Sequence, residues 1–173
     1  MAKAGTAPIL ATPGDAIAAF ERDLPKALKG RTLEEVGWRR LDGMTLLVPL
    51  KGRRVDGTLD DYLLRLGFAF YPDWPPNALF VNPQTSNYEL AKDKYWLPKI
   101  DGCNEIAVHA DYNNNGQLIC CSLTLEFYAV LHGVQPDHVW NPEKHNFSAT
   151  INQIGWALKS QFYKGRHDVL PPG

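Results

Sequence analysis

Residues 71–80 read YPDWPPNALF, and this stretch decides the fold prediction. Its three prolines fix the backbone and remove amide donors, so the segment forms a rigid turn that cannot extend a sheet. Apolar segments stand on either side of it, at residues 62–71 and 78–82. We therefore predict a strand, a rigid turn and a new strand, with aromatic side chains packed over the turn.

Upstream of this turn the sequence predicts one helix and two more strands. Residues 12–30 begin with Thr12 as a cap and Pro13 at the first helical position, and apolar residues then recur at helical spacing. Asp42 and Gly43 form a hairpin signal. The four predicted strands are residues 35–41, 44–50, 62–71 and 78–82. An N-terminal helix followed by a four-stranded antiparallel meander predicts an α+β fold.

The second half of the sequence is less regular. Residues 82–115 lack sustained periodicity, and a loop this long inside a compact domain is usually functional. An apolar run around two cysteines follows at residues 117–125, and a helical turn is predicted at residues 126–133. Ser148 can cap a final helix, whose apolar stripe is Ile151, Ile154, Leu158 and Phe162. We expect a long active-site loop region and then a crossover helix packed on the sheet.

The bulk properties indicate a single globular domain. The chain has 173 residues, 45% of them hydrophobic, and its formal net charge is −1. We expect a flexible leader at residues 1–11, the domain at residues 12–163 and a flexible tail at residues 164–173. No stretch approaches the roughly 20 apolar residues that a membrane span needs, and the N-terminus lacks the apolar core of a secretory signal. We expect a cytoplasmic protein without membrane or nucleic-acid partners.

Three motifs resemble the ubiquitin-conjugating enzyme (UBC) family. The turn fits the family pattern Y-P-x-x-P-P-x-(small)-x-F, and residues 140–142, WNP, resemble the Trp-x-Pro that follows the family's active-site cysteine. Residues 109–120, HADYNNNGQLIC, resemble the segment that runs from His-Pro-Asn through Asn-Gly to Ile-Cys. The resemblance covers residues 12–163. The long insertion between Phe80 and His109 resembles the departures seen in divergent bacterial members of the family, whose genes lie in ubiquitin-like conjugation operons.

The resemblance implies a UBC-like fold and an enzyme that carries a ubiquitin-like protein as a thioester on Cys120. The implied partners are that ubiquitin-like protein, its activating enzyme and a target protein, with a role in antiphage defence. No cofactor and no metal are implied, because the activating enzyme consumes the ATP. A thiol suits this chemistry, since it is both a nucleophile and a good leaving group.

The sequence offers two adjacent thiols for this role. In an extended strand Cys120 and Cys121 face opposite sides. The run Ile119-Cys120-Cys121 is similar to the family's Ile-Cys-Leu, which implies that Cys121 is a small buried residue and Cys120 the nucleophile. A purely structural role for both thiols is the alternative. Cys103 lies in a polar stretch without a motif, and three cysteines do not form a disulfide framework.

Three residues near Cys120 are candidate auxiliary groups: His109, Asp111 and Asn115. In the family, the histidine usually packs or forms hydrogen bonds. Asp111 occupies the position of the family's oxyanion asparagine, and its carboxylate could orient a cationic amine. An asparagine of the run 113–115 could donate its amide to the oxyanion. A plain turn before Gly116 is the alternative for at least two of these asparagines.

Other functions are open alternatives. A catalytically inactive UBC-like module would bind a ubiquitin-like protein or its activating enzyme without forming a thioester. A zinc site has enough candidate ligands, but none has C-x-x-C or H-x-x-x-H spacing. A cysteine hydrolase needs its cysteine at a helix N-terminus with a paired histidine, whereas Leu118 and Ile119 precede Cys120.

Overall fold

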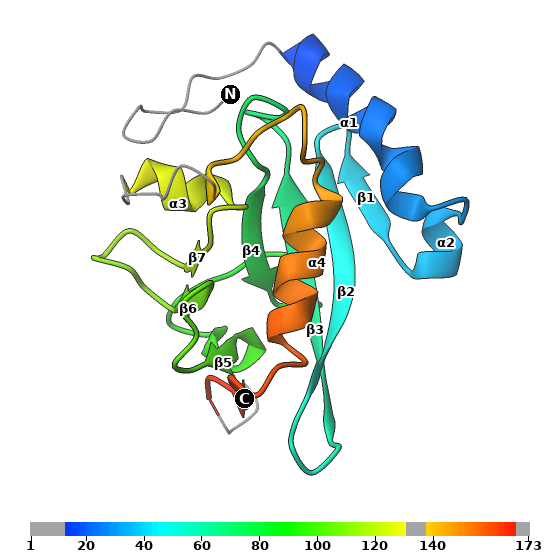
Figure 1. Cartoon of the computed structure of the whole chain (residues 1–173). Helices are drawn as coiled ribbons and strands as arrows, with labels where there is room; N and C mark the ends of the chain where they lie inside the picture. Colours follow the sequence, from blue (N-terminus) through cyan, green and yellow to red (C-terminus); the bar gives the residue numbers. More distant parts are fainter. Residues whose placement is uncertain (1–12, 131–137, 169–173) are drawn as a thin grey trace.

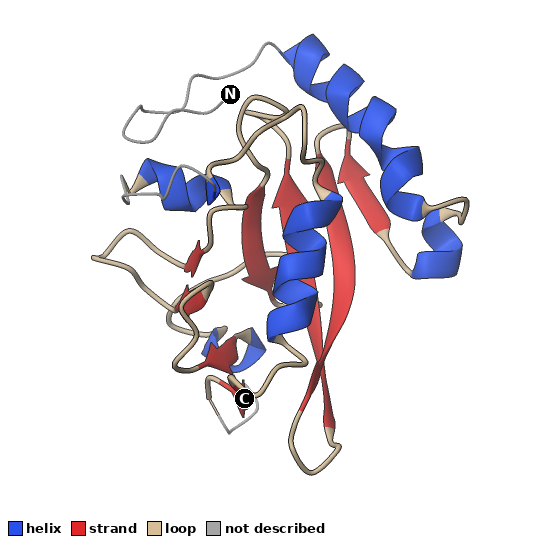
Figure 2. Ribbon diagram, viewed as in Figure 1, coloured by secondary structure: helices blue, strands red, loops and turns tan. Residues whose placement is uncertain are grey.

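The computed structural model describes residues 13–130 and 138–168 (Figure 1). The predicted leader at residues 1–11 and the predicted cap Thr12 lie outside these residues. The described chain combines helices with a four-stranded antiparallel sheet, which confirms the predicted α+β class (Figure 2). None of its described helices has the length and apolar character that crossing a membrane requires.

The main sheet is a meander with the strand order β1-β2-β3-β4, as predicted. Its strands are β1 (Arg39–Asp42), β2 (Thr45–Arg53), β3 (Leu59–Gly67) and β4 (Asn77–Val81). Leu46 pairs with Leu66, and Leu64 pairs with Phe80, so one face of the sheet is lined by fully buried apolar side chains. This apolar face forms one side of the hydrophobic core.

Two helices precede the sheet. Helix α1 (Pro13–Leu28) continues past Pro25, and its buried Phe20 contacts the ring of Phe68 with centroids 4.3 Å apart. Helix α2 (Leu33–Val36) replaces the start of the strand predicted at residues 35–41. The side chain of Thr32 accepts the amide of Glu35, and the Glu35 carboxylate accepts the amide of Thr32. This capping box stabilises a helical turn before β1 begins.

A final helix, α4 (Ser148–Ala157), packs against the sheet (Figure 2). The predicted cap is wrong, because Ser148 is the first helical residue, Phe147 precedes it as N-cap, and no side chain caps the helix. The helix also ends at Ala157, before Leu158 and Phe162 of the predicted stripe. Ile151 and Ile154 of this helix are buried in the core, and the amide of Arg53 on β2 donates to the carbonyl of Leu158 at 2.9 Å. Two short helices, η1 (Lys94–Trp96) and α3 (Leu125–Ala129), lie in the segment between β4 and α4.

Two small sheets complete the described chain. Strand β6 (Ala107–His109) pairs with β7 (Leu118–Cys120), and β5 (Pro98–Ile100) pairs with β8 (Tyr163–Arg166). The prediction of a flexible tail from residue 164 is therefore wrong for residues 164–166. The Tyr163 hydroxyl donates to buried Asp60 at 2.5 Å, and the Arg166 guanidinium stacks 4.3 Å from the Tyr95 ring. These tertiary contacts hold β8 in place.

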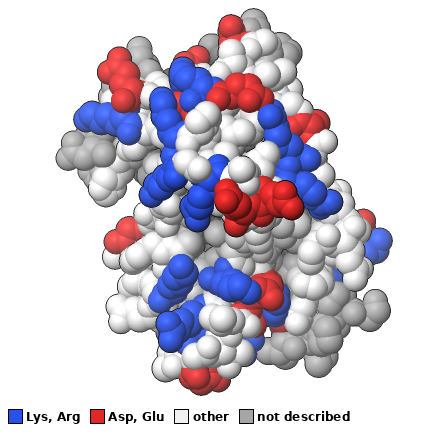
Figure 3. Space-filling model, turned by 90° about the vertical axis from the view of Figure 1, so that its right-hand side faces the viewer, with Lys and Arg blue, Asp and Glu red and all other residues white. Residues whose placement is uncertain are grey.

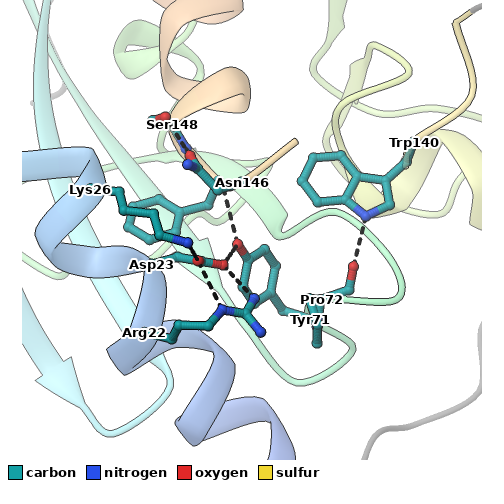
Figure 4. A network of polar contacts seen from close by, with 9 residues as sticks. Arg22, Asp23, Lys26, Tyr71, Pro72, Trp140, Asn146 and Ser148 are labelled. Carbon is teal, nitrogen blue, oxygen red and sulfur yellow. Dashed lines mark hydrogen bonds and ion pairs between the residues drawn. The ribbon is translucent and has the colours of Figure 1, made fainter. Parts of the chain in front are cut away.

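The proline-rich turn joins elements that lie far apart in the sequence (Figure 4). The Tyr71 hydroxyl donates to Asp23 on α1 at 2.5 Å and accepts the amide of Phe147, just before α4, at 3.3 Å. The indole of Trp140 donates to the carbonyl of Pro72 at 2.8 Å. The turn therefore fixes where α1 and the segment leading to α4 meet the sheet.

Asp23 is a buried charge within this joint. Burial opposes its ionisation, but hydrogen bonds from Arg22, Tyr71 and Lys26 outweigh that effect and lower its pKa to about 2. The carboxylate is thus ionised at neutral pH and ties α1 to the turn.

Candidate active site

Cys120 is the last residue of β7, where the strand gives way to a loop. Its side chain is half-buried, whereas Cys121 is 2% exposed and belongs to the core. The two neighbours therefore face different environments, which confirms the predicted burial of Cys121. No disulfide joins the three cysteines. Of the adjacent pair, Cys120 is the more exposed thiol.

The surroundings do not strongly activate either thiol. Burial raises the pKa of Cys120, and burial raises that of Cys121 further, to about 11, with smaller contributions from Cys120 and Cys103. Cys120 is thus a thiol with a small thiolate fraction at neutral pH. Such a group exchanges acyl chains slowly when unassisted, and it resists adventitious oxidation.

His109 lies on the strand beside the cysteine. In the β6–β7 pair, Ala107 is opposite Cys120, and His109 is opposite Leu118. The pleat puts His109 and Cys120 on one face as diagonal neighbours, roughly 7–8 Å apart. The imidazole packs against the ring of Tyr112 in a tilted arrangement, with centroids 5.2 Å apart and an interplanar angle of 60°. This contact fits a packing role for His109.

Asp111 and Asn115 belong to one tight turn. The Asp111 carboxylate accepts the amide of Gly116 at 2.8 Å, and the side-chain amide of Asn115 donates to the carbonyl of Asn113 at 3.1 Å. Asn113 and Asn114 have φ angles of 51° and 61°. The left-handed backbone confirms that these two asparagines form a turn, which places the rim of the site next to β7.

Two polar side chains that the sequence did not single out hold the cysteine segment against the sheet. Buried Gln117 accepts the amide of Phe80 at 2.7 Å and donates to the carbonyl of Phe80 at 2.8 Å. Buried Thr124 donates to the carbonyls of Ile119 and Cys121 at 2.7 and 2.9 Å. The Gln117 side chain thus makes the two hydrogen bonds to the β4 backbone that a neighbouring strand would otherwise make, and it fixes the position of β7.

Glu126, at the start of α3, is a third side chain that the sequence did not indicate. Its carboxylate accepts the amide of Ala78 at 3.3 Å and the side-chain amide of Asn77. Burial raises its pKa to about 7, although hydrogen bonds from the backbone amides of Glu126 and Ala78 favour the charged form. A glutamate in a helix start reads as an ordinary surface residue, and only the packing of α3 on β4 changes its environment.

The long segment between β4 and β6 is ordered around the site. The carboxylate of buried Asp93 accepts the Asn82 side chain at 3.0 Å and the Glu89 amide at 2.7 Å. The Tyr88 hydroxyl donates to the carbonyl of Ala110 at 2.9 Å. Through Tyr88, this predicted loop region supports the strand end that precedes Asp111.

Cys103 lies in the same segment, before β6. Its thiol donates to the Glu105 carboxylate at 3.1 Å and is half-buried against the core. Among residues 13–130 and 138–168, no three histidine, cysteine or carboxylate side chains are grouped so that they could hold a metal ion.

The comparisons with known proteins leave the family of this chain unassigned. No protein-family model, no curated protein and no solved structure gives a significant match. The candidate site therefore rests on its own geometry: a half-exposed thiol at the end of β7, a buried neighbour, and a polar frame that ties both to β4.

Proposed function

We propose that this protein is a ubiquitin-conjugating-enzyme-like carrier with a UBC-like fold. Cys120 accepts the C-terminal carboxylate of a ubiquitin-like protein as a thioester from an activating enzyme, and passes it to a target protein. The observation that carries the proposal is the position of Cys120, a reachable thiol at a strand end beside a buried thiol. Gln117 ties the start of the cysteine strand to Phe80 on β4, and Glu126 ties the following helix α3 to the same strand, so both sides of the cysteine segment are anchored.

The arrangement of elements supports the proposal. An N-terminal helix, a four-stranded meander, an irregular segment with the cysteine and a crossover helix follow in that order. The proline-rich turn contacts the Trp140 segment, so the motifs that resemble the UBC family meet in space rather than only in sequence.

The chemistry needs a modest nucleophile. The Cys120 thiolate attacks the carbonyl of the incoming thioester, a new C–S bond forms, and the cysteine of the activating enzyme leaves as a thiolate. A raised pKa keeps most of the Cys120 population protonated, which limits side reactions of the empty carrier. In this proposal the turn formed by Asp111 and Asn115 shapes the rim, and His109 supports it.

The proposal is tested by adduct formation. Purified full chain is mixed with ATP and with a candidate ubiquitin-like protein and activating enzyme encoded by neighbouring genes. We expect a band that reductant removes for the wild type and for Cys121→Ser. With Cys120→Ser we expect a reductant-resistant ester or no band, and with Cys120→Lys a stable amide or no band.

The same experiment separates the carrier from an inactive binding module. Such a module would bind the ubiquitin-like protein or the activating enzyme, measured by calorimetry, yet give no covalent band with the wild type. A reductant-sensitive band that persists in Cys120→Ser and disappears in Cys121→Ser would show that Cys121, and not Cys120, carries the thioester.

A further inference from the structure

A groove of about 590 Å³ lies on the main sheet, away from the cysteine segment. Its floor includes Pro49 and Leu63, which stand opposite each other on β2 and β3 and face away from the core. Pro83 and Trp96, from the segment between β4 and β6, also line it, as does Val36 of α2. We call this feature the outer groove.

The segment between β4 and β6 covers the neighbouring part of the same sheet face. Ser86 accepts hydrogen bonds from Arg65 through its carbonyl at 3.3 Å and from Arg39 through its hydroxyl at 3.4 Å. Leu47 and Val81 point to the same side as the groove floor, and both are fully buried. This cover stops at the outer groove, where the apolar floor remains partly exposed.

The described chain reaches its last residues beside this groove. Arg166 donates to the carbonyl of Asp61 at 3.0 Å, and its guanidinium lies 5.4 Å from the centre of the Trp96 ring. Asp61 and Trp96 both line the groove. The amide of His167 donates to the carbonyl of Leu97 at 2.7 Å, and β8 runs antiparallel to β5, so the chain continues from Leu97 towards Trp96.

Residues 169–173, VLPPG, follow immediately and lie outside the described residues. Its prolines favour the polyproline II conformation, which rises about 3.1 Å per residue, so five residues span roughly 15 Å. Neighbouring strands lie about 4.8 Å apart, so a path from Trp96 across β3 to Pro49 on β2 is roughly 10 Å long. The segment is therefore long enough to cross the floor of the outer groove.

The chemistry of the segment also matches the groove. VLPPG has no charged side chain, and proline-rich segments dock in grooves lined by aromatic rings. The floor residues Pro49 and Leu63 are apolar, and the charged pair at the groove, Lys51 and Asp61, is already joined by a salt bridge. An uncharged occupant can cover the apolar floor without breaking that pair.

We propose that residues 169–173 fold back into the outer groove of their own chain, with Leu170 and the two prolines over Trp96, Leu63 and Pro49. The groove and its occupant are joined through β8, so the effective concentration is in the millimolar range and weak apolar contacts suffice. The segment then completes the cover of this sheet face that Ser86 and its arginines begin. This inference does not depend on the carrier function of Cys120.

The first test compares the full chain with a chain shortened to residue 168. Isotope-labelled proteins are examined by NMR, and the readouts are the Leu63 methyl groups and the indole N–H of Trp96. We expect both to shift between the two proteins, whereas the methyl groups of Ile17 on α1 coincide. Identical Leu63 and Trp96 resonances in the two proteins would overturn the proposal.

The second test restores the segment from outside. The peptide DVLPPG is added to the shortened chain, and we expect it to move the Leu63 and Trp96 resonances saturably to their positions in the full chain. In the full chain these positions should not change on dilution. Movement towards the shortened chain on dilution would show that a second copy supplies the segment, and would overturn docking within one chain.

Two substitutions separate the groove from the rest of the surface. Leu170→Asp in the full chain should give the Trp96 resonance of the shortened chain, and Pro49→Glu in the shortened chain should weaken peptide binding about tenfold or more, because the peptide would bury a charge. Val55→Glu is the matched control, since Val55 is 97% exposed at the tip of the β2–β3 hairpin, and it should leave binding within about twofold. Equal peptide affinity of the Pro49→Glu and Val55→Glu proteins would overturn the assigned groove.

Discussion

Cys120 and Cys121 are neighbours in the chain but differ in what surrounds them. Cys121 lies in the core, where the charged thiolate would lose its hydration and gain no compensating cation. Cys120 is half-buried at the strand end, so it loses less hydration and can meet a partner. At the scale of single residues, the strand pleat therefore divides the two thiols into a structural one and an accessible one.

This difference predicts selective alkylation. Iodoacetamide should modify Cys120 roughly tenfold faster than Cys121 in the folded protein, because the thiolate must be both formed and exposed. The rate at Cys120 should keep rising with pH beyond about 8.5, since burial raises its pKa. Peptide mapping by mass spectrometry gives both rates. Equal labelling of the two residues would show that the pleat does not protect Cys121.

Gln117 makes a further prediction at this scale. Its side chain makes two hydrogen bonds to the backbone of Phe80, and both backbone groups are buried. Gln117→Leu should lower the free energy of unfolding by about 1–3 kcal/mol, because it leaves an amide and a carbonyl without partners. Gln84→Leu, which changes an exposed glutamine, should alter the free energy of unfolding by less than about 0.5 kcal/mol in denaturant titrations.

At the scale of elements, the proline-rich turn is the joint of the fold. Its Tyr71 lies at the meeting point of α1 and the segment before α4, and its Pro72 carbonyl anchors Trp140. Helix α1 contacts β1 through Arg40, which pairs with Glu21 and lies over the Phe20 ring, and the turn adds a second anchor at Asp23. The turn therefore supplies the long-range contact that the local sequence cannot.

Removing one hydroxyl tests this joint. Tyr71→Phe should lower the free energy of unfolding by about 1–3 kcal/mol, since it leaves the Phe147 amide unpaired and takes a donor from Asp23. The control is Tyr95→Phe, whose hydroxyl makes no hydrogen bond to a described residue. Chemical denaturation measures both variants, and an equal effect of the two substitutions would contradict the role of the joint.

The elements with strong local signals were predictable from the sequence. The apolar stripe of α1 and the hairpin signal at Asp42 and Gly43 fixed the start of the meander, and the proline turn fixed the break between β3 and β4. The strand predicted at residues 35–41 is wrong at its start, because the capping pair Thr32 and Glu35 stabilises a helical turn there.

Other features depend on contacts that local sequence does not encode. Strand β8 follows helix α4. It forms because Tyr163 donates a hydrogen bond to Asp60 and the Arg166 guanidinium packs over aromatic rings of other elements. In the site, alternation of Cys120 and Cys121 was readable from the strand period. The burial of Glu126 was not, because it arises from the contact of α3 with β4.

At the scale of the whole molecule, positive and negative residues nearly balance, with 18 lysines and arginines against 19 aspartates and glutamates. The face shown in Figure 3 carries lysine, arginine, aspartate and glutamate side by side, in keeping with a net charge of −1. Some carboxylates are buried instead of lying on the surface. Among them, Asp23 and Asp60 are held ionised by neighbouring arginines and tyrosines. These buried groups, rather than the surface, should govern the response of stability to acid.

Asp23 gives this response a defined window. Its pKa is about 2 in the folded protein and 3.8 as the ordinary value, so its contribution is present above pH 3.8 and is lost as pH falls through 2. The loss amounts to about 2 kcal/mol of the free energy of unfolding. Urea titrations from pH 5 to pH 2 should show this decrease in the wild type and a shallower one in Asp23→Asn.

Asp73→Asn is the control for that series. It removes an exposed carboxylate from the same proline turn, which forms no ion pair with a described residue, and should leave the slope of stability against pH close to that of the wild type. A parallel pH profile for wild type and Asp23→Asn would contradict the assignment of the buried charge.

The most direct test of the carrier account maps the bond itself. Full-length protein is charged with a ubiquitin-like protein by its activating enzyme and ATP, digested without reductant and analysed by mass spectrometry. The account predicts the C-terminal peptide of the ubiquitin-like protein on Cys120 through a reductant-labile bond. A bond to Cys121 or Cys103, or binding of the partners without any covalent adduct, would contradict it.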